Sequence, residues 1–168
     1  MKQIIITIKR KELIYDIENI THHIANNRLK ELDAESKSNV QLSPQEESAL
    51  AIALREIDHA WGDVQSILRN QLTVIKKTAD DTLNMTSTDD FVLNLNEPDS
   101  FNEALTQPAT QAIHEFLVNR VIYKWLSLTK PNEASIYLQY AAEAKEKVKN
   151  LLASRCGFYL LDEFPKYR

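Results

Sequence analysis

The chain has 168 residues, of which 43% are hydrophobic and 26% charged, and its net charge is −4. This length and composition fit one globular domain, and the acidic balance gives no overall attraction to nucleic acid or to an anionic membrane. Only Gly62 and Gly157 are glycines, and they are isolated. Phosphate cradles and dinucleotide turns depend on clustered glycines, so the composition argues strongly against a classical nucleotide-binding enzyme.

The cysteine count and the apolar runs of the sequence indicate the cellular compartment. A single cysteine, Cys156, excludes an intramolecular disulfide and fits a reducing compartment. No apolar run approaches the ~20 residues of a transmembrane helix. Residues 1–10 are basic and then apolar, but the apolar run is too short for a signal peptide and lacks a cleavage pattern. These features predict a cytoplasmic protein.

The first quarter of the chain predicts a strand followed by a helix. Residues 3–8 are β-branched and short, as in a strand. From Lys11 onward, apolar residues recur with the spacing of a helix that buries one stripe, and Asn26 and Asn27 are expected to fray its end because their amides compete for backbone hydrogen bonds. The stripe comprises Leu13, Ile17, Ile20 and Ile24.

A polar loop, residues 29–42, precedes a second helix. Ser43, Pro44 and Glu46 form a capping box, in which the serine cap alone contributes about 1 kcal/mol. Gly62 costs about 1 kcal/mol relative to alanine, and we interpret it as a point where a neighbouring helix approaches. The predicted buried stripe of this helix comprises Leu50, Leu54, Ile57, Trp61, Val64 and Leu68.

Two further short runs, residues 72–75 and 91–95, are typical of strands. They form either a hairpin or two edge strands. Strands this short need another surface to lie on, and the N-terminal strand is a candidate.

The second half of the chain predicts a helical hairpin after a helical turn near residues 101–105. The helix that starts near Pro108 is apolar over more than half of its circumference, so it is either central or also contacts another subunit. The fourth helix, residues 133–153, is expected to pack back on it. The apolar residues of the third helix are Ile113, Phe116, Leu117, Val118, Val121, Ile122, Tyr123, Trp125 and Leu128; those of the fourth are Ile136, Tyr137, Tyr140, Ala144, Val148, Leu151 and Leu152.

Together these elements predict a mainly α fold, a four-helix bundle-like domain with a small β element, whose core includes Trp61, Phe116, Trp125 and Tyr140. The domain covers residues 1–155 and is followed by an apolar C-terminal segment, residues 156–168. Terminal segments are usually polar, so this one either docks on its own domain or inserts into a partner. Its apolar residues are Phe158, Tyr159, Leu160, Leu161, Phe164 and Tyr167.

No grouping of residues indicates catalysis. Cys156 follows a helix end, where the helix dipole disfavours a thiolate. The acidic pairs at residues 80–81 and 89–90 lack the spacing of a calcium loop and fit turns better. No serine lies in a strand–turn–helix elbow. We therefore predict no catalytic residue and no cofactor.

The four histidines are interpreted as surface or satisfied polar residues rather than metal ligands. His22 and His23 are adjacent and point apart on a helix. His114 begins a zinc-protease-like pattern, but Val118 stands where its second histidine belongs. His59 and His114 lie on different helices, and the carboxylate–histidine pattern that a composite site would need is not found in register, so no metal site is predicted.

Nucleic-acid binding is also disfavoured. The third and fourth helices could form a helix-turn-helix, but the fourth has mixed charge rather than the basic surface of a reading helix. The lysine clusters at residues 76–77 and 145–149 fit solvated faces. We expect no sequence-specific nucleic-acid partner and no membrane partner.

The second half of the chain resembles a known family. Residues 96–102 (Asn-Glu-Pro-Asp-Ser-Phe-Asn), the apolar helix from 112 to 126 and the Tyr-centred stretch 134–144 resemble the head–tail connector, or neck adaptor, proteins of tailed phages and prophages. The resemblance lies in hydrophobicity and length rather than in an invariant motif. It implies a non-enzymatic virion subunit in a ring between portal and tail, located in the virion or host cytoplasm.

That resemblance accounts for the wide apolar helix, the loop 29–42 and the apolar segment after residue 155. The partners that it implies are further copies of the chain and the portal and tail proteins. The expected contact residues are Phe158, Tyr159, Leu160, Leu161, Phe164, Tyr167, Val118 and Ile122. The alternative is a helical regulatory or small-ligand-binding module of a bacterial cell, and His59, His114 and Tyr123 around one cavity would favour it. A metal-dependent enzyme is a third possibility.

Overall fold

The computed structural model describes residues 2–31, 47–73 and 90–153. It is mainly helical, with four helices and a two-stranded antiparallel sheet, which confirms the predicted fold class. In chain order, the elements are β1 (Lys2–Ile8), α1 (Arg10–Glu31), α2 (Glu47–Ile67), β2 (Phe91–Glu97), the 3-10 turn η2 (Glu103–Leu105), α3 (Thr106–Thr129), α4 (Pro131–Val148) and the π-helical turn η3 (Lys149–Ala153).

The sheet pairs the N-terminal strand with a strand more than 80 residues further along the chain. β1 and β2 run antiparallel, with Lys2 opposite Glu97 and Ile8 opposite Phe91. Side chains alternate along both strands, so that one face of the sheet packs on the core and the other faces outward. The strands predicted at residues 3–8 and 91–95 are confirmed. Of the run at residues 72–75, Leu72 forms an isolated bridge to Leu95, and residues 74 and 75 lie outside the described residues.

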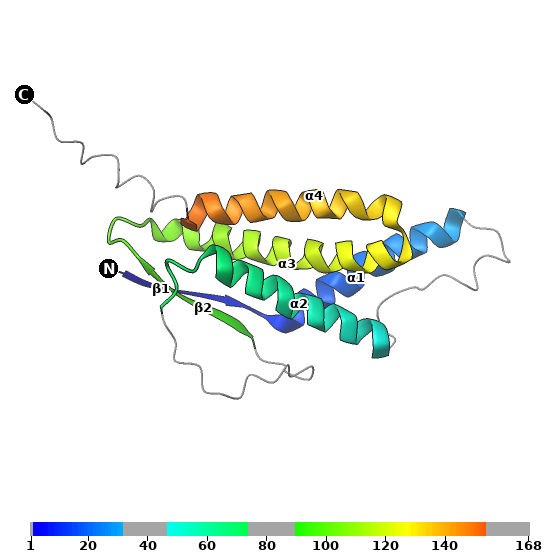
Figure 1. The fold of residues 1–168 in the computed structure, drawn as a ribbon, viewed down its shortest axis with the longest axis horizontal. Coiled ribbons are helices and arrows are strands. Elements are labelled where there is room, and N and C mark those ends of the chain that lie inside the picture. Colours follow the sequence, from blue (N-terminus) through cyan, green and yellow to red (C-terminus); the bar gives the residue numbers. More distant parts are fainter. Residues whose placement is uncertain (1, 32–46, 74–89, 154–168) are drawn as a thin grey trace, which may run out of the picture.

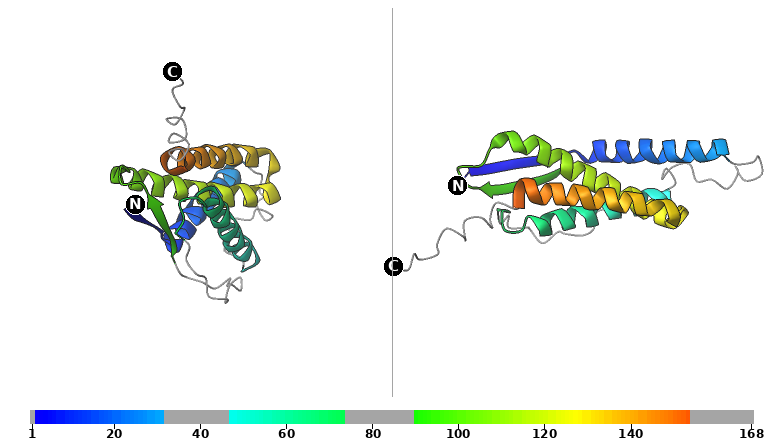
Figure 2. Two further views of the ribbon diagram at one scale, coloured as in Figure 1. Left: turned by 60° about the vertical axis from the view of Figure 1, so that its left-hand side comes forward. Right: turned by 90° about the horizontal axis from the view of Figure 1, so that it is seen from above.

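The helices lie on one side of this sheet. In Figure 1, α3 and α4 run side by side along the long axis, and α2 runs obliquely below α3. Figure 2 shows the sheet at the flank of the helical layer, with α1 extending from the sheet toward the opposite end of the molecule. The predicted helical hairpin, α3 and α4, therefore extends along the length of the domain.

α3 is the central element, which decides between the two interpretations of its wide apolar face. It contacts α1, α2, α4 and β1, so its own domain surrounds it. Its buried side chains are Ala109, Ala112, Ile113, Phe116, Leu117, Val118, Val121, Ile122, Trp125 and Leu126.

α4 packs through only part of the predicted stripe, because Ala144, Val148 and Leu152 are buried as expected but two of the stripe's large residues before them are not. Tyr140 is 48% exposed and Ile136 is 50% exposed, so neither belongs to the core. Leu128, expected on the buried face of α3, is 64% exposed. The large side chains of α3 fill the space between the helices, and α4 contributes mostly small residues, which permit close approach. The buried residues of this stretch are Ala134, Ala141, Ala144, Val148 and Leu152.

Two helix details also differ from expectation. α1 does not fray at Asn26 but continues to Glu31. The Asn26 side-chain amide lies 3.2 Å from a ring nitrogen of His22, so it is engaged by a side chain one turn earlier instead of the backbone. At Gly62, an added Cβ would meet nothing within 4 Å, so no helix approaches there. The capping box at residues 43–46 lies outside the described residues.

Candidate functional site

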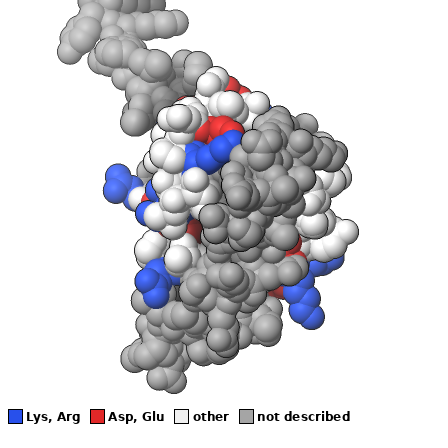
Figure 3. Space-filling model, turned by 90° about the vertical axis from the view of Figure 1, so that its right-hand side faces the viewer, with Lys and Arg blue, Asp and Glu red and all other residues white. Residues whose placement is uncertain are grey.

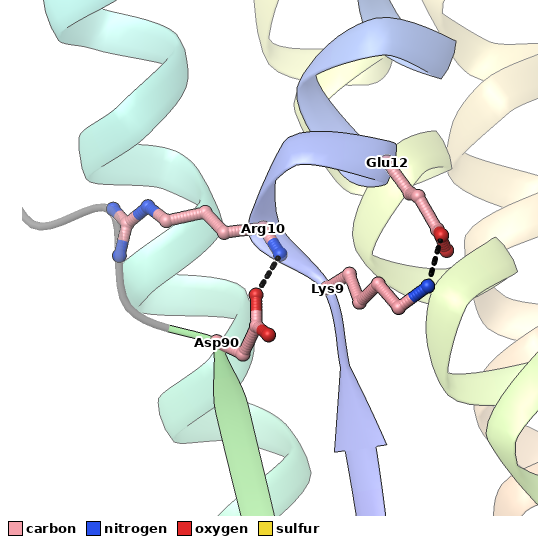
Figure 4. Close-up of polar contacts among 4 residues, drawn as sticks. All are labelled: Lys9, Arg10, Glu12 and Asp90. Atoms are coloured by element: carbon pink, nitrogen blue, oxygen red, sulfur yellow. Dashed lines mark hydrogen bonds and ion pairs between the residues drawn. The ribbon is translucent and has the colours of Figure 1, made fainter.

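The junction between β1 and α1 gathers four polar residues from two distant parts of the chain (Figure 4). The backbone N–H of Arg10 donates to Oδ1 of Asp90 at 3.2 Å, and Nζ of Lys9 donates to Oε1 of Glu12 at 2.8 Å. The Glu12 hydrogen bond and charge, together with the Asp90 charge, raise the pKa of Lys9 above 10.5. Asp90 thus accepts a hydrogen bond from one of the free N–H groups at the start of α1, and its negative charge interacts favourably with the positive end of the helix dipole.

The side chain of Arg10 points away from that junction and into the domain. Nη2 lies 3.0 Å from Oδ1 of Asp58, and the guanidinium stands over the ring of Phe91 at 5.0 Å. The Phe91 ring in turn packs on Trp61 with 4.8 Å between centroids. One buried cation therefore joins α1, α2 and β2. The carboxylate and the ring neutralise and cover it, which is a structural role.

Two more polar links join the helices. His114 Nε2 lies 2.8 Å from Oδ2 of Asp16, between α3 and α1. Glu56 on α2 lies 3.4 Å from Nε of Arg120 and 3.7 Å from Nδ1 of His59. These pairs are neither fully buried nor fully exposed, so each contributes modestly to stability.

The residues that would favour a ligand pocket are not brought together. The Tyr123 ring lies 5.9 Å from the Arg120 guanidinium carbon, so it is connected to His59 through Arg120 and Glu56. His114 pairs with Asp16 and lies nine positions before Tyr123 on α3, which corresponds to about 13.5 Å along the helix axis. The three side chains therefore do not surround one site.

The remaining sequence-derived candidates have the following positions. His22 and His23 are exposed on α1. Among the residues described, no group of three or more His, Cys, Asp and Glu side chains could hold a metal ion, and no helix is long and apolar enough to cross a membrane. Cys156 and the pair at 80–81 lie outside the described residues.

The expected partner-contact residues divide into two groups. Val118 and Ile122 are 5% and 0% exposed and belong to the core around α3, so they present no surface to a partner. The wide apolar face of α3, to which they belong, is explained by the central position of this helix. The other six, all within residues 158–167, lie outside the described residues.

Among the exposed large apolar side chains of the described residues, two groups form surfaces that the sequence analysis did not assign. The first, the α4 ridge, consists of Ile136 and Tyr140, one turn apart, which are 50% and 48% exposed. The second, the outer sheet face, is the solvent side of β1 and β2 and is centred on Ile5 and Val92, which are 61% and 46% exposed. Its six residues are Gln3, Ile5, Thr7, Val92, Asn94 and Asn96. The available signal for the second surface was Ile5, which puts an apolar residue on the strand face opposite to that of Ile4, Ile6 and Ile8.

Charge does not mark a nucleic-acid surface in the described residues. On the face in Figure 3, basic and acidic side chains are scattered among uncharged ones. In the lysine cluster of residues 145–149, Lys147 pairs with Glu115 at 3.3 Å and Lys149 pairs with Glu146 at 2.6 Å. Pairing of this kind is typical of a solvated helix face.

Comparisons with known proteins identify no relative. No protein-family model, curated protein or solved structure matches this chain. The functional argument therefore depends on the surfaces of the domain.

Proposed function

We propose that this protein is a non-enzymatic assembly subunit, similar in role to a head–tail connector of a tailed phage, that packs into a ring with further copies and with portal and tail proteins. The observation that supports this proposal best is the α4 ridge. Ile136 and Tyr140 are large, apolar and half exposed on a helix whose buried stripe is already formed by other residues. Adjacent exposed apolar side chains are a feature of protein–protein contact sites, which supports the proposal.

The ridge has the character of an interface anchor. Tyrosine is enriched among residues that dominate binding, because it combines a large apolar ring with a polar tip. The Tyr140 ring lies edge-on to Tyr137, with 5.9 Å between centroids and 83° between planes. This contact restricts the Tyr140 ring before binding, which reduces the entropy lost on association.

The ridge is bordered by charged side chains that suit the rim of an interface. Glu143 accepts a hydrogen bond from Gln139 at 3.1 Å, and Lys147 lies 3.3 Å from Glu115 on α3. An apolar centre with a polar, solvent-exposed rim is the usual anatomy of a protein–protein contact. The expected segment 158–167 provides a second contact in this proposal.

The proposal is tested with the full chain by light scattering over a concentration series, and by co-purification with portal and tail proteins encoded beside it. The second arm is needed because such connectors can remain monomeric before assembly. Assembly or capture is expected for the wild type, with at least about a tenfold loss of affinity for Tyr140→Lys.

The matched control is Ala142→Lys, an exposed position on the same helix that adds the same charge away from the ridge. It should retain assembly. A strict monomer that captures no partner, or equal behaviour of the two variants, would contradict the proposal.

A further inference from the structure

The outer sheet face is an uncharged surface with an apolar centre. Ile5 pairs with Asn94 and Val92 pairs with Thr7, so Ile5 and Val92 are diagonal neighbours on one side of the sheet. The remaining positions of this face carry amides and a hydroxyl. The helices cover the opposite side (Figure 2), so the described helices leave this apolar pair exposed.

Lysines stand at both ends of β1. Lys2, at the start of the strand, pairs with Glu103. Lys9, directly after its end, is 64% exposed at its side chain although it contacts Glu12. An occupant of the outer sheet face would therefore have an apolar stretch over Ile5, and an acidic residue four positions further along would share the exposed Lys9 ammonium with Glu12.

The chain itself contains a segment with that pattern. Residues 158–161 are Phe-Tyr-Leu-Leu, and residues 162–163 are Asp-Glu. An extended chain advances about 3.3 Å per residue, so the step from Phe158 to Asp162 equals the step from Ile5 to Lys9. If this segment bound in an extended conformation with Phe158 over Ile5, its Asp162 would come beside Lys9 and its Cys156 beside Gln3.

We propose that the outer sheet face of one copy receives residues 158–163 of a second copy. This inference rests on the proposed assembly function. Each chain then carries both the donor segment and a different acceptor surface, so the contact between two copies is head-to-tail. When the rotation between neighbouring subunits permits, repetition of this contact closes a ring.

The position of the last described residues of the chain favours a second copy as the acceptor. The Leu152 carbonyl accepts a hydrogen bond from Nε2 of Gln71 at 3.3 Å, and the Gln71 carbonyl accepts from the backbone N–H of Asn96 at 2.7 Å. Leu152 is 1% exposed and belongs to the core. The last described residues therefore lie on the helix-covered side of the sheet, whereas the acceptor surface is on the other side.

The single native cysteine provides the test. Gln3→Cys places a second thiol at the exposed position expected beside Cys156 of the neighbour, and Asn19→Cys on α1 is the control at an exposed position away from the sheet. Both full-length variants are oxidised, and the products are separated on a non-reducing gel. We expect Gln3→Cys to form disulfide-linked dimers and longer chains about tenfold faster than the control.

A second variant tests the chemistry of the contact. Val92→Lys introduced together with Gln3→Cys should slow linkage about tenfold, because it places a charge on the apolar centre. Circular dichroism checks that this exposed substitution leaves the fold intact.

Three outcomes would overturn the inference: linkage no faster than the control, linkage only within one chain, or linkage unaffected by Val92→Lys. Light scattering and partner capture by the wild type separate this inference from the proposed function. If complexes form without Gln3→Cys linkage, only the inference fails, and if neither is observed, both fail.

Discussion

Nη2 of Arg10 lies 3.0 Å from Oδ1 of Asp58, and the Arg10 side chain is only 5% exposed. This pair joins the start of α1 to the middle of α2. Removal of one partner from a buried ion pair leaves an uncompensated charge, which costs far more than the net stabilisation by the intact pair.

Asp58→Ala should therefore lower the free energy of unfolding by about 2–3 kcal/mol, measured by urea denaturation. Arg10→Met, which removes the charge and retains an apolar chain over Phe91, should cost less in the Asp58→Ala background than in the wild type. Additive losses in the double variant would show that the pair is not coupled.

Asp90 caps α1 from 80 positions away. Asp90→Ala removes the acceptor for the Arg10 N–H and the negative charge at the helix start, and should destabilise the protein by about 1 kcal/mol. Asp63→Ala, at an exposed position within α2, is the control and should change stability by less than about 0.5 kcal/mol. Equal effects in thermal or urea unfolding would exclude a capping role.

Gly62 lies in the interior of α2, where an added Cβ meets nothing within 4 Å. Gly62→Ala should stabilise the protein by about 0.5–1 kcal/mol, because alanine has the higher helix propensity and restricts the unfolded chain. A higher midpoint of urea unfolding with an unchanged slope is the expected signature. Destabilisation would indicate a close contact at this position.

Leu117 and Leu128 lie on the same helix but differ in burial, at 0% and 64% exposed. Leu117→Ala creates a cavity and should cost about 2–5 kcal/mol, whereas Leu128→Ala should cost less than about 0.5 kcal/mol. Chemical denaturation of the two variants gives the comparison. Similar losses would contradict the central placement of α3.

Tyr137 makes stability sensitive to alkaline pH. Burial, with contributions from Tyr140 and Glu133, raises the pKa of Tyr137 above 10.0. Because the folded state holds the phenol proton more tightly, this contribution is fully present below pH 10.0 and is lost as the pH rises through the folded-state pKa.

Tyr137→Phe should therefore flatten the decline of stability above that pH, measured by urea unfolding between pH 8 and pH 11.5. The control Tyr15→Phe, at a position 65% exposed on α1, should retain the wild-type decline. An unchanged slope for Tyr137→Phe would rule out this phenol as the cause.

Local patterns in the sequence located most elements of the fold. The stripe of α2 at Ile57, Trp61, Val64 and Leu68 is buried as its helical spacing predicts. The β-branched run at residues 3–8 and the run at 91–95 form the two strands. The turn expected near 101–105 is the 3-10 turn η2. Each of these signals is contained within one element, so neighbours were not needed to interpret it.

The errors arose where two apolar stripes competed on one helix. On α4, both the Ile136–Tyr140 stripe and the alanine stripe have helical spacing, and hydrophobicity favours the first. Packing selected the second because α3 already provides large side chains, and small residues allow close approach. The candidate contact residues Val118 and Ile122 are buried by their own domain, and the width of an apolar face could not show this, because it does not tell which molecule covers the face.

The sequence by itself determined the mainly helical class, the order of the elements and the strands, because these depend on side-chain periodicity over short stretches. Only the tertiary structure decided which apolar faces remain exposed and which distant charges meet. The Arg10–Asp58 pair, the Asp90 cap, the α4 ridge and the outer sheet face all depend on how separate elements pack, and long-range packing leaves no periodic signal within a single element.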